Sequence, residues 1–399
     1  MNTPQEIVIS SYARTPIGKF GGSLSRFSAP ELGGMAIKAA IERAGAKPED
    51  VCEVIMGHVL QAGVGQNPAR QAAIKAGCPT SVSAVTVNKV CGSGLKAVML
   101  ASQTLACGDM DVVVAGGMES MSRAPYLIPQ ARDGVRLGHA QLLDAMIQDG
   151  LWCPFENWHM GSAAEHIAAS SGIGRAEQDA FALESQMRAA KAWSEKKFTP
   201  EIVPVAIPQK KGDPVLFNQD EGYRADTTAE SLAGLKPAFD RQKGTVTPGN
   251  ASTINDGGAA LLLTRKDLAQ KKGWPVKAIV RAQAVGGVDP KMIFHAPVVA
   301  VTKLLKKTGL TVKDIDLVEA NEAFAVQALE NMRELGLDPS KVNIWGGAVA
   351  LGHPIGASGA RVLCTLLNAL EQTNGKRGIA TLCLGGGNAV ALLVERVQS

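Results

Sequence analysis

The sequence is poor in the features that mark several classes of protein. Only 4% of the residues are aromatic, and the formal net charge is +4 over 399 residues. No Lys/Arg-rich run with interleaved aromatic residues is present, which argues against a nucleic-acid partner. The apolar stretches are short and interrupted by glycine or charge, so a membrane is not an expected partner either.

The cysteines give a second set of exclusions. There are seven of them, and no two form a CxxC pair. An odd number without such a pair argues against a disulfide framework and against a structural zinc site. The N-terminus, MNTPQEIVIS, leads directly into a predicted strand without the basic and apolar segments of a targeting sequence. We therefore expect reduced cysteines, no bound metal and a cytoplasmic location.

What the sequence contains instead is an alternation of strand and helix patterns. With 46% hydrophobic residues and this length, it predicts two or three α/β domains with a mostly parallel sheet covered by helices. In the first third of the chain, the patterns predict strands over 6–10, 51–57 and 111–117, a helix over 30–44 that stops at Gly45, and a helix after 91–94.

The same pattern returns later in the chain. Residues 36–57 align without a gap on residues 300–321. One residue out of that register, the Ser-Gly pair at 93–94 matches the pair at 358–359, and each pair opens an apolar helix. Matches in the same order predict a duplication, with two similar α/β halves packed face to face.

Residues 118–243 interrupt this pattern, being richer in Pro, Met, Trp and charge. We interpret them as an inserted loop domain that lies over the first half. The predicted N-terminal half then comprises 1–117 and is completed by 244–268, where the chain is expected to return to the first sheet. The predicted C-terminal half comprises 269–399.

Cys91 is the first candidate for chemistry. It follows the strand pattern AVTVN and precedes Gly-Ser-Gly and a predicted helix. Such a strand–turn–helix elbow exposes the side chain and directs free helix N–H groups at it, and both effects favour the reactive thiolate. A small buried hydrophobic residue is the commoner role of a free cysteine, so this segment alone leaves both interpretations open.

Three further polar residues stand at the ends of predicted strands. Cys383 ends an apolar strand just before three glycines, at the edge where α/β sheets place chemistry, although for this segment alone a core role is the more common one. His353 lies between Gly352 and Pro354, a rigid turn suited to an oriented base. Asn321 can hold a water molecule, donate to an oxyanion or cap the following helix.

The other glycine clusters do not indicate a nucleotide cofactor. GVGQNP at 63–68 lacks the third glycine of a dinucleotide fingerprint, and CGSGLK at 91–96 is not a P-loop. We expect no tightly bound cofactor.

Four segments together resemble the thiolase family in order and spacing: NKVCGSGLKAV at 88–98, NEAFA at 321–325, GHPIGASGAR at 352–361 and CLGGG at 383–387. The resemblance extends from ARTPIGKFGGSL near the N-terminus to the last strand. HMGSAAEHIA at 159–168 and GTVTPGNAS at 244–252 resemble the acetyl-CoA acetyltransferase branch rather than the long-chain degradative one.

The resemblance implies a fold and a reaction. The fold is a pair of βαβαβαββ halves that form a five-layered α/β/α/β/α sandwich with an inserted loop domain. The reaction is the reversible Claisen condensation of two acetyl-CoA molecules to acetoacetyl-CoA and CoA. The resemblance also implies a homodimer, commonly paired into a homotetramer through the insertion.

The resemblance further implies a role for each matching residue. Cys91 would carry the acetyl group as a thioester, and His353 would take its proton. Cys383 would be the acid and base for the second acetyl-CoA. Asn321 would hold a water molecule that, with His353, stabilises the thioester oxygen of the bound CoA ester. The backbone amides of Cys91 and Gly385 would form a second oxyanion hole. Further positions match contacts with CoA or the acyl group: His159, Met160, Arg224, Ser231, Ser252, Ala323 and Phe324.

The sequence departs from the family at several positions that bear on the acyl group. Phe294 and His295 replace a Met/Gly-rich segment that borders the acyl pocket, and Ile293 stands where Met is usual. Trp158 and Trp345 also replace the usual residues. The alternatives are a 3-ketoacyl-CoA thiolase of broader chain length in fatty-acid degradation and a non-catalytic acyl-CoA-binding paralogue. A dinucleotide-dependent oxidoreductase is disfavoured by the incomplete glycine fingerprint.

Overall fold

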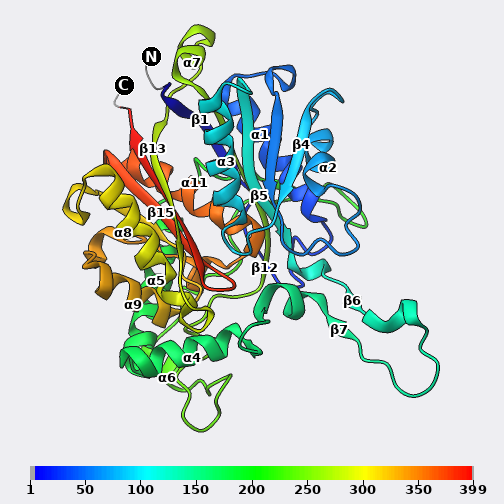
Figure 1. Ribbon diagram of the computed structural model, residues 1–399, viewed down its shortest axis with the longest axis vertical. Helices are drawn as coiled ribbons and strands as arrows, with labels where there is room; N and C mark the ends of the chain where they lie inside the picture. Colours follow the sequence, from blue (N-terminus) through cyan, green and yellow to red (C-terminus); the bar gives the residue numbers. More distant parts are fainter. Residues whose placement is uncertain (1–4, 398–399) are drawn as a thin grey trace.

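Two α/β halves share one ten-stranded sheet in the computed structural model, which describes residues 5–397. The strands follow the order β14-β15-β16-β13-β1-β12-β5-β3-β4, and β2 pairs with β12 at the side. β1 and β13 meet through only two residue pairs, Val8 with Ile279 and Ile9 with Ala278. The sheet is therefore two smaller sheets joined by a narrow seam (Figure 1).

The N-terminal half has the βαβαβαββ order that the resemblance implied. Its elements are β1 (Ile7–Arg14), α1 (Ala29–Ala44), β3 (Glu53–Gly57), α2 (Pro68–Lys75), β4 (Ser83–Val87), α3 (Ser93–Cys107), β5 (Val112–Ser120) and β12 (Asn255–Arg265). α1 ends at Gly45, whose φ of 69° is the left-handed conformation that glycine adopts at helix ends. The predicted stop of this helix is confirmed.

The C-terminal half repeats this order with one strand reduced. Its elements are β13 (Ala278–Gly287), α8 (Ala296–Thr308), β14 (Leu317–Ala320), α9 (Ala325–Leu335), α10 (Ala348–Leu351), α11 (Ile355–Thr373), β15 (Arg377–Leu384) and β16 (Asn388–Arg396). In the place of β4, a single parallel bridge joins Val342 to Val318. The segment that follows reads Asn-Ile-Trp-Gly-Gly, and glycine weakens a strand.

The expectation of a mostly parallel sheet is wrong. β3 runs parallel to β4 and β5, and β14 runs parallel to β15. β12 is antiparallel to β1 and β5, and β16 is antiparallel to β13 and β15. Parallel neighbours need a crossover helix, whereas β16 follows β15 after a short glycine turn, which can only give an antiparallel pair. The alternating pattern of helices and strands in the sequence therefore could not predict the direction of β16.

α3 and α11 form the middle layer of the molecule. α1 and α2 lie on the outer side of the first sheet and α8 and α9 on the outer side of the second, which gives the five-layered sandwich (Figure 1). α3 and α11 touch at the duplicated Ser-Gly pairs. A Cβ on Gly94 would lie 2.7 Å from the backbone nitrogen of Ala360, and one on Gly359 would lie 2.3 Å from that of Leu95. Only glycine permits this approach.

α3 and the turn before it, Val90–Cys107, are apolar and long enough to qualify by composition as a membrane span. The helix packs against α11, β5 and β3. These contacts identify it as a core helix of the folded protein.

The chain between β5 and β12 covers one end of the molecule. Its elements are β6 (Tyr126–Leu127), β7 (Leu143–Asp144), β8 (Trp152–Cys153), β9 (Trp158–His159), α4 (Met160–Ser171), α5 (Arg175–Ser194), β10 (Val205–Ile207), β11 (Val215–Phe217) and α6 (Ala229–Ala233). α4 and α5 pack on α9 of the C-terminal half, and the β6–β7 hairpin projects from the body (Figure 1). The exact domain boundaries stay a prediction.

Candidate active site

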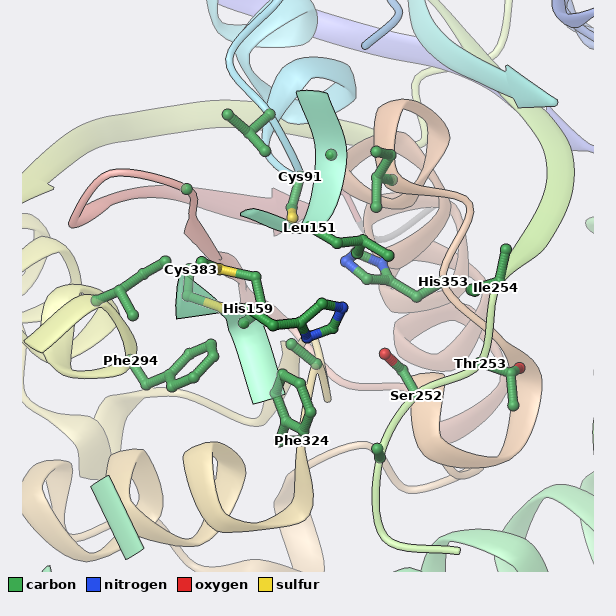
Figure 2. Close-up of a pocket in the computed structure, with 18 of the residues that line it drawn as sticks. Cys91, Leu151, His159, Ser252, Thr253, Ile254, Phe294, Phe324, His353 and Cys383 are labelled. Atoms are coloured by element: carbon green, nitrogen blue, oxygen red, sulfur yellow. The ribbon is translucent and has the colours of Figure 1, made fainter. Parts of the chain in front are cut away.

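A cavity of about 320 Å³ lies where the two halves meet the inserted segment (Figure 2). Most of the positions singled out in the sequence line it: Cys91, His159, Met160, Ser252, Ala323, Phe324, His353, Cys383 and Gly385. Within residues 5–397, no aspartate, glutamate, lysine or arginine forms part of its wall. The cavity is therefore an apolar space that two thiols and two imidazoles enter.

Three of the predicted residues lie outside this cavity. Arg224 lines a neighbouring hollow. Ser231 belongs to α6, where its hydroxyl accepts from the Thr228 amide at 3.0 Å and its amide donates to the Thr228 hydroxyl at 3.1 Å, the reciprocal bonding of a helix cap. Asn321 is fully buried beside His353, with 3.4 Å between its amide nitrogen and Nδ1 of that histidine.

Cys91 stands on the sharp turn that the sequence predicted between β4 and α3. Val90 has a φ of 46°, a left-handed conformation that costs a β-branched residue about 1–3 kcal/mol. The turn is held by Ser93, whose hydroxyl donates to the Val90 carbonyl at 2.6 Å and accepts from the Lys89 amide at 2.8 Å. Asn88 accepts from the Val90 amide at 3.0 Å. These bonds fix the strained turn and aim Cys91 into the cavity.

The protonation state of Cys91 differs from what the sequence suggested. Burial raises the pKa of its thiol to about 12, although hydrogen bonds from the backbone amides of Cys91 and Gly385 act in the opposite direction. The helix N-terminus was expected to favour the thiolate, but desolvation of the charged form outweighs it. Cys91 is therefore a thiol at neutral pH and needs a base to become a nucleophile.

His353 is placed to be that base. Its Nδ1 lies 2.6 Å from the hydroxyl of Ser358, and that hydroxyl lies 2.9 Å from the Pro354 carbonyl, which can only accept. The single hydroxyl hydrogen goes to the carbonyl, so Nδ1 carries the imidazole proton and donates to Ser358. Nε2 has no partner among residues 5–397 and keeps its lone pair. Burial lowers the pKa of His353 to about 3, so the ring is neutral.

The loop that carries His353 is fixed to the N-terminal half by Asn255. The side-chain oxygen of Asn255 accepts from the His353 amide at 2.9 Å, and its nitrogen donates to the Gly18 carbonyl at 3.0 Å. Gly352 has a φ of 107°, and a Cβ there would lie 2.4 Å from Cγ of Asn255. A residue of β12 in the N-terminal half thus fixes the position of His353, which belongs to the C-terminal half.

Glu119, at the end of β5, was not identified from the sequence. Its buried carboxylate lies 3.1 Å from Nε2 of His58 and accepts from the amides of Val59 at 3.1 Å and Gly356 at 2.9 Å. It therefore ties the first sheet to the start of α11. Glu119 is itself one of the nine buried residues of β5, and a glutamate near the end of this apolar run was the only available signal.

Cys383 enters the cavity from the end of β15. Burial, followed by the charge of neighbouring Cys91, raises its pKa well above the ordinary value. Figure 2 shows both sulfur atoms turned into the same space, with the imidazole of His353 beside them. The site therefore combines two thiols that hold their protons with one neutral imidazole that can accept a proton.

Aromatic rings form the remaining wall. Phe294 and Phe324 meet edge to face with 5.4 Å between ring centroids (Figure 2). Phe239 stacks on His159 at 4.9 Å, so close to Gly161 that a Cβ there would lie 2.1 Å from the ring. Phe239 was missed because it lies in an irregular segment without periodicity. Trp345 packs on Phe198 in the core and does not line the cavity.

Comparison with known proteins agrees with this geometry. The model "Thiolase, N-terminal domain" matches residues 7–267, and "Thiolase, C-terminal domain" matches residues 274–396. An acetyl-CoA acetyltransferase from Chromobacterium violaceum is 56% identical over 98% of this chain and 100% of its own length. One from Cupriavidus necator is also 56% identical, over 98% and 99%. The crystal structure of the Bacillus anthracis acetyl-CoA acetyltransferase superposes with a TM-score of 0.97 at 43% identity, covering 100% of both chains.

Proposed function

The chain belongs to the thiolase family, and we propose that it is an acetyl-CoA C-acetyltransferase that condenses two acetyl-CoA molecules reversibly to acetoacetyl-CoA and CoA. The observation that carries the proposal is the convergence of Cys91, Cys383 and the unpaired Nε2 of His353 in one apolar cavity. Acetyl-CoA and CoA are substrates here, and the reaction needs no tightly bound cofactor.

The first half-reaction transfers an acetyl group to Cys91. Nε2 of His353 takes the thiol proton as the sulfur attacks the thioester carbonyl of acetyl-CoA. The backbone amides of Cys91 and Gly385 hold the oxygen of the tetrahedral intermediate, which collapses to acetyl-Cys91. The departing CoA thiolate takes the proton of Cys383 and leaves as CoA.

The second half-reaction makes the carbon–carbon bond. The Cys383 thiolate left by the first step removes an α-proton from a second acetyl-CoA. The enolate oxygen is stabilised by the Nε2–H of His353 and by a water held by Asn321. The enolate carbon attacks acetyl-Cys91, and the Cys91 sulfur leaves with the proton of His353. In the thiolytic direction Cys383 is the acid, which suits a thiol whose pKa burial raises.

The two cysteines have separable roles, and this provides the test. We expect Cys91→Ser to abolish acyl transfer, with no acetyl adduct by mass spectrometry after incubation with acetyl-CoA. We expect Cys383→Ser to form the adduct on Cys91 while condensation falls by about 10²-fold or more, because the acid–base group for the α-proton is lost. Equal loss of the adduct in both variants would refute this division of roles. An unmodified wild-type Cys91 in the folded enzyme would instead favour the non-catalytic acyl-CoA-binding alternative.

The acyl preference is a separate question. Phe294, 2% exposed, and Phe324 close the wall beside Cys383, which favours a short acyl group over the longer chains of the degradative alternative. We expect kcat/KM for thiolysis of acetoacetyl-CoA to exceed that of a six-to-eight-carbon 3-ketoacyl-CoA by about tenfold. A profile measured across chain lengths checks this. Faster turnover of the longer substrate would assign the enzyme to fatty-acid degradation.

The assembly and location follow as part of the same proposal. The β6–β7 hairpin exposes Tyr126, Leu137 and Leu142, and apolar side chains on a projecting arm suit contact with another copy of the chain. This supports a homodimer that pairs into a homotetramer. The free cysteines of the described residues are compatible with a reducing cytoplasm.

A further inference from the structure

A second hollow of about 380 Å³ opens beside the active-site cavity. The two share one wall, formed by Pro248, Ser252, Thr253 and Ile254. Lys19 and Phe20 also line the second hollow, next to this shared wall. They belong to the segment ARTPIGKFGGSL, which no step of the proposed reaction uses.

The charge of the two spaces differs. Among residues 5–397, the wall of the active-site cavity contains no charged side chain, whereas the second hollow is lined by Lys19 and Arg224. Neither of these cations forms a salt bridge within the described chain. A CoA thioester carries phosphates and adenine at the end remote from the acyl group. The apolar cavity suits the acyl and thioester end, while the phosphates need cations.

The wall carrying Lys19 and Phe20 is held in place by backbone contacts. β2 (Gly18–Lys19) pairs with β12, and the Phe20 amide donates to the Ile254 carbonyl at 3.1 Å. The carboxylate of Glu221 accepts from the Lys19 amide at 2.8 Å. A Cβ on Gly22 would lie 2.4 Å from that carboxylate, so the turn requires glycine.

These bonds leave the two side chains free. The Phe20 ring is 56% exposed although its backbone is pinned to the wall. The carboxylate of Glu221 is directed at the turn itself, since it also accepts from the Ser23 hydroxyl at 2.7 Å. An exposed aromatic ring and a free ammonium group thus stand together on one fixed turn.

We propose that Lys19 and Phe20 bind the nucleotide end of the CoA substrate, with the ammonium group on phosphate oxygens and the ring against adenine. The assignment rests on the proposed function and extends it to a part of the N-terminal half. A ring fixed by its backbone loses little conformational freedom when a base stacks on it, and one such stack is typically worth enough to change affinity severalfold or more.

The test compares two substrate pairs. One is thiolysis of acetoacetyl-CoA by CoA, and the other is thiolysis of acetoacetyl-pantetheine by pantetheine, which lacks every phosphate and the adenine. We expect Lys19→Met to raise KM for the CoA pair about threefold and Phe20→Ala to raise it about tenfold, with kcat unchanged. Neither variant should change KM for the pantetheine pair. Lys303→Met, an exposed lysine on α8, is the matched control and should behave as wild type with both pairs.

Salt gives an independent readout. The wild-type KM for the CoA pair should rise with ionic strength, and this rise should be shallower in Lys19→Met because one phosphate contact is gone. An unchanged KM for the CoA pair in both variants overturns the inference. An equal rise with both pairs also overturns it, since the turn would then act only on the shape of the site. Absence of turnover of either pair by the wild-type enzyme would count against the proposed function instead.

Discussion

The hydrogen bonds around His353 determine which of its two ring nitrogens carries the proton. The Ser358 hydroxyl accepts a hydrogen bond from Nδ1–H and donates one to the Pro354 carbonyl, so Nε2 keeps the lone pair. In this arrangement Ser358 is a positioning residue that touches no substrate. In the proposed mechanism it keeps the imidazole in the tautomer that can accept the proton of Cys91.

We expect Ser358→Ala to lower kcat by about 10²-fold, the lower range of what an oriented general base contributes, while KM stays near the wild-type value. Stopped-flow acetylation of Cys91 with acetyl-CoA would measure this step directly. Ser102→Ala is a matched control, since it removes the same atom from a buried position on α3. A fall in kcat that the control reproduces would mean that helix packing, rather than the histidine tautomer, is responsible.

His353 should also make the free energy of unfolding depend on pH, with lower stability in acid. Burial lowers the pKa of His353 from 6.5 to about 3, so the native state excludes a proton that the unfolded chain accepts below about pH 6.5. The stability from the neutral ring is present above that pH and is lost as pH falls towards 3, by up to about 1.4 kcal/mol per pH unit. The same burial keeps the base unprotonated across the neutral range.

The sequence identified Cys91, His353 and Cys383 because each stands beside glycine or proline at the end of a predicted strand. It could not give the pKa of Cys91, because that value depends on how much of the chain covers the thiol. It also could not reveal Glu119 or Asn255, whose partners are distant in sequence: Glu119 to Gly356 and Asn255 to Gly18.

Among the elements, the β6–β7 hairpin is the one on which the proposed assembly depends. It carries the most exposed apolar side chain of the described residues, Leu137, which is fully accessible. None of residues 126–144 lines the cavity. The hairpin is therefore separable from catalysis and available for assembly.

We expect replacement of residues 128–142 by a short Asn-Gly turn to reduce the assembly by one step, from tetramer to dimer, because the arm's apolar contacts are removed. Sedimentation velocity measures the change, and turnover per chain should persist. A variant that sediments like wild type would show that the copies associate through another surface.

Element prediction succeeded where local pattern decides the structure. α1 was predicted almost residue for residue, because periodicity and a terminal glycine mark it. The prediction of a mostly parallel sheet was wrong, because the directions of β12 and β16 depend on partner strands that are distant in sequence or that follow after a turn. In the second half, a single bridge at Val342 stands where the first half has β4. The alignment of the two repeats does not indicate this difference.

At the scale of the molecule, the duplication was visible from the alignment of 36–57 on 300–321 and from two Ser-Gly pairs, and the structure explains why the pairs recur. At Gly94 and Gly359 the backbones of α3 and α11 approach so closely that a side chain would not fit. Both halves therefore need glycine at the same place. That contact brings the start of α3, with Cys91, towards the start of α11, with His353. The active site is therefore a consequence of how the two repeats cross.

The packing of α3 on α11 also has a consequence for how the chain folds during synthesis. The largest hydrophobic cluster joins Leu95 and Val98 of α3 to Leu363 and Leu367 of α11, so each half covers a face that the other leaves bare. A nascent chain on the ribosome carries an uncovered α3 until α11 has been synthesised. A chain that lacks α11 therefore leaves the apolar face of α3 without its partner.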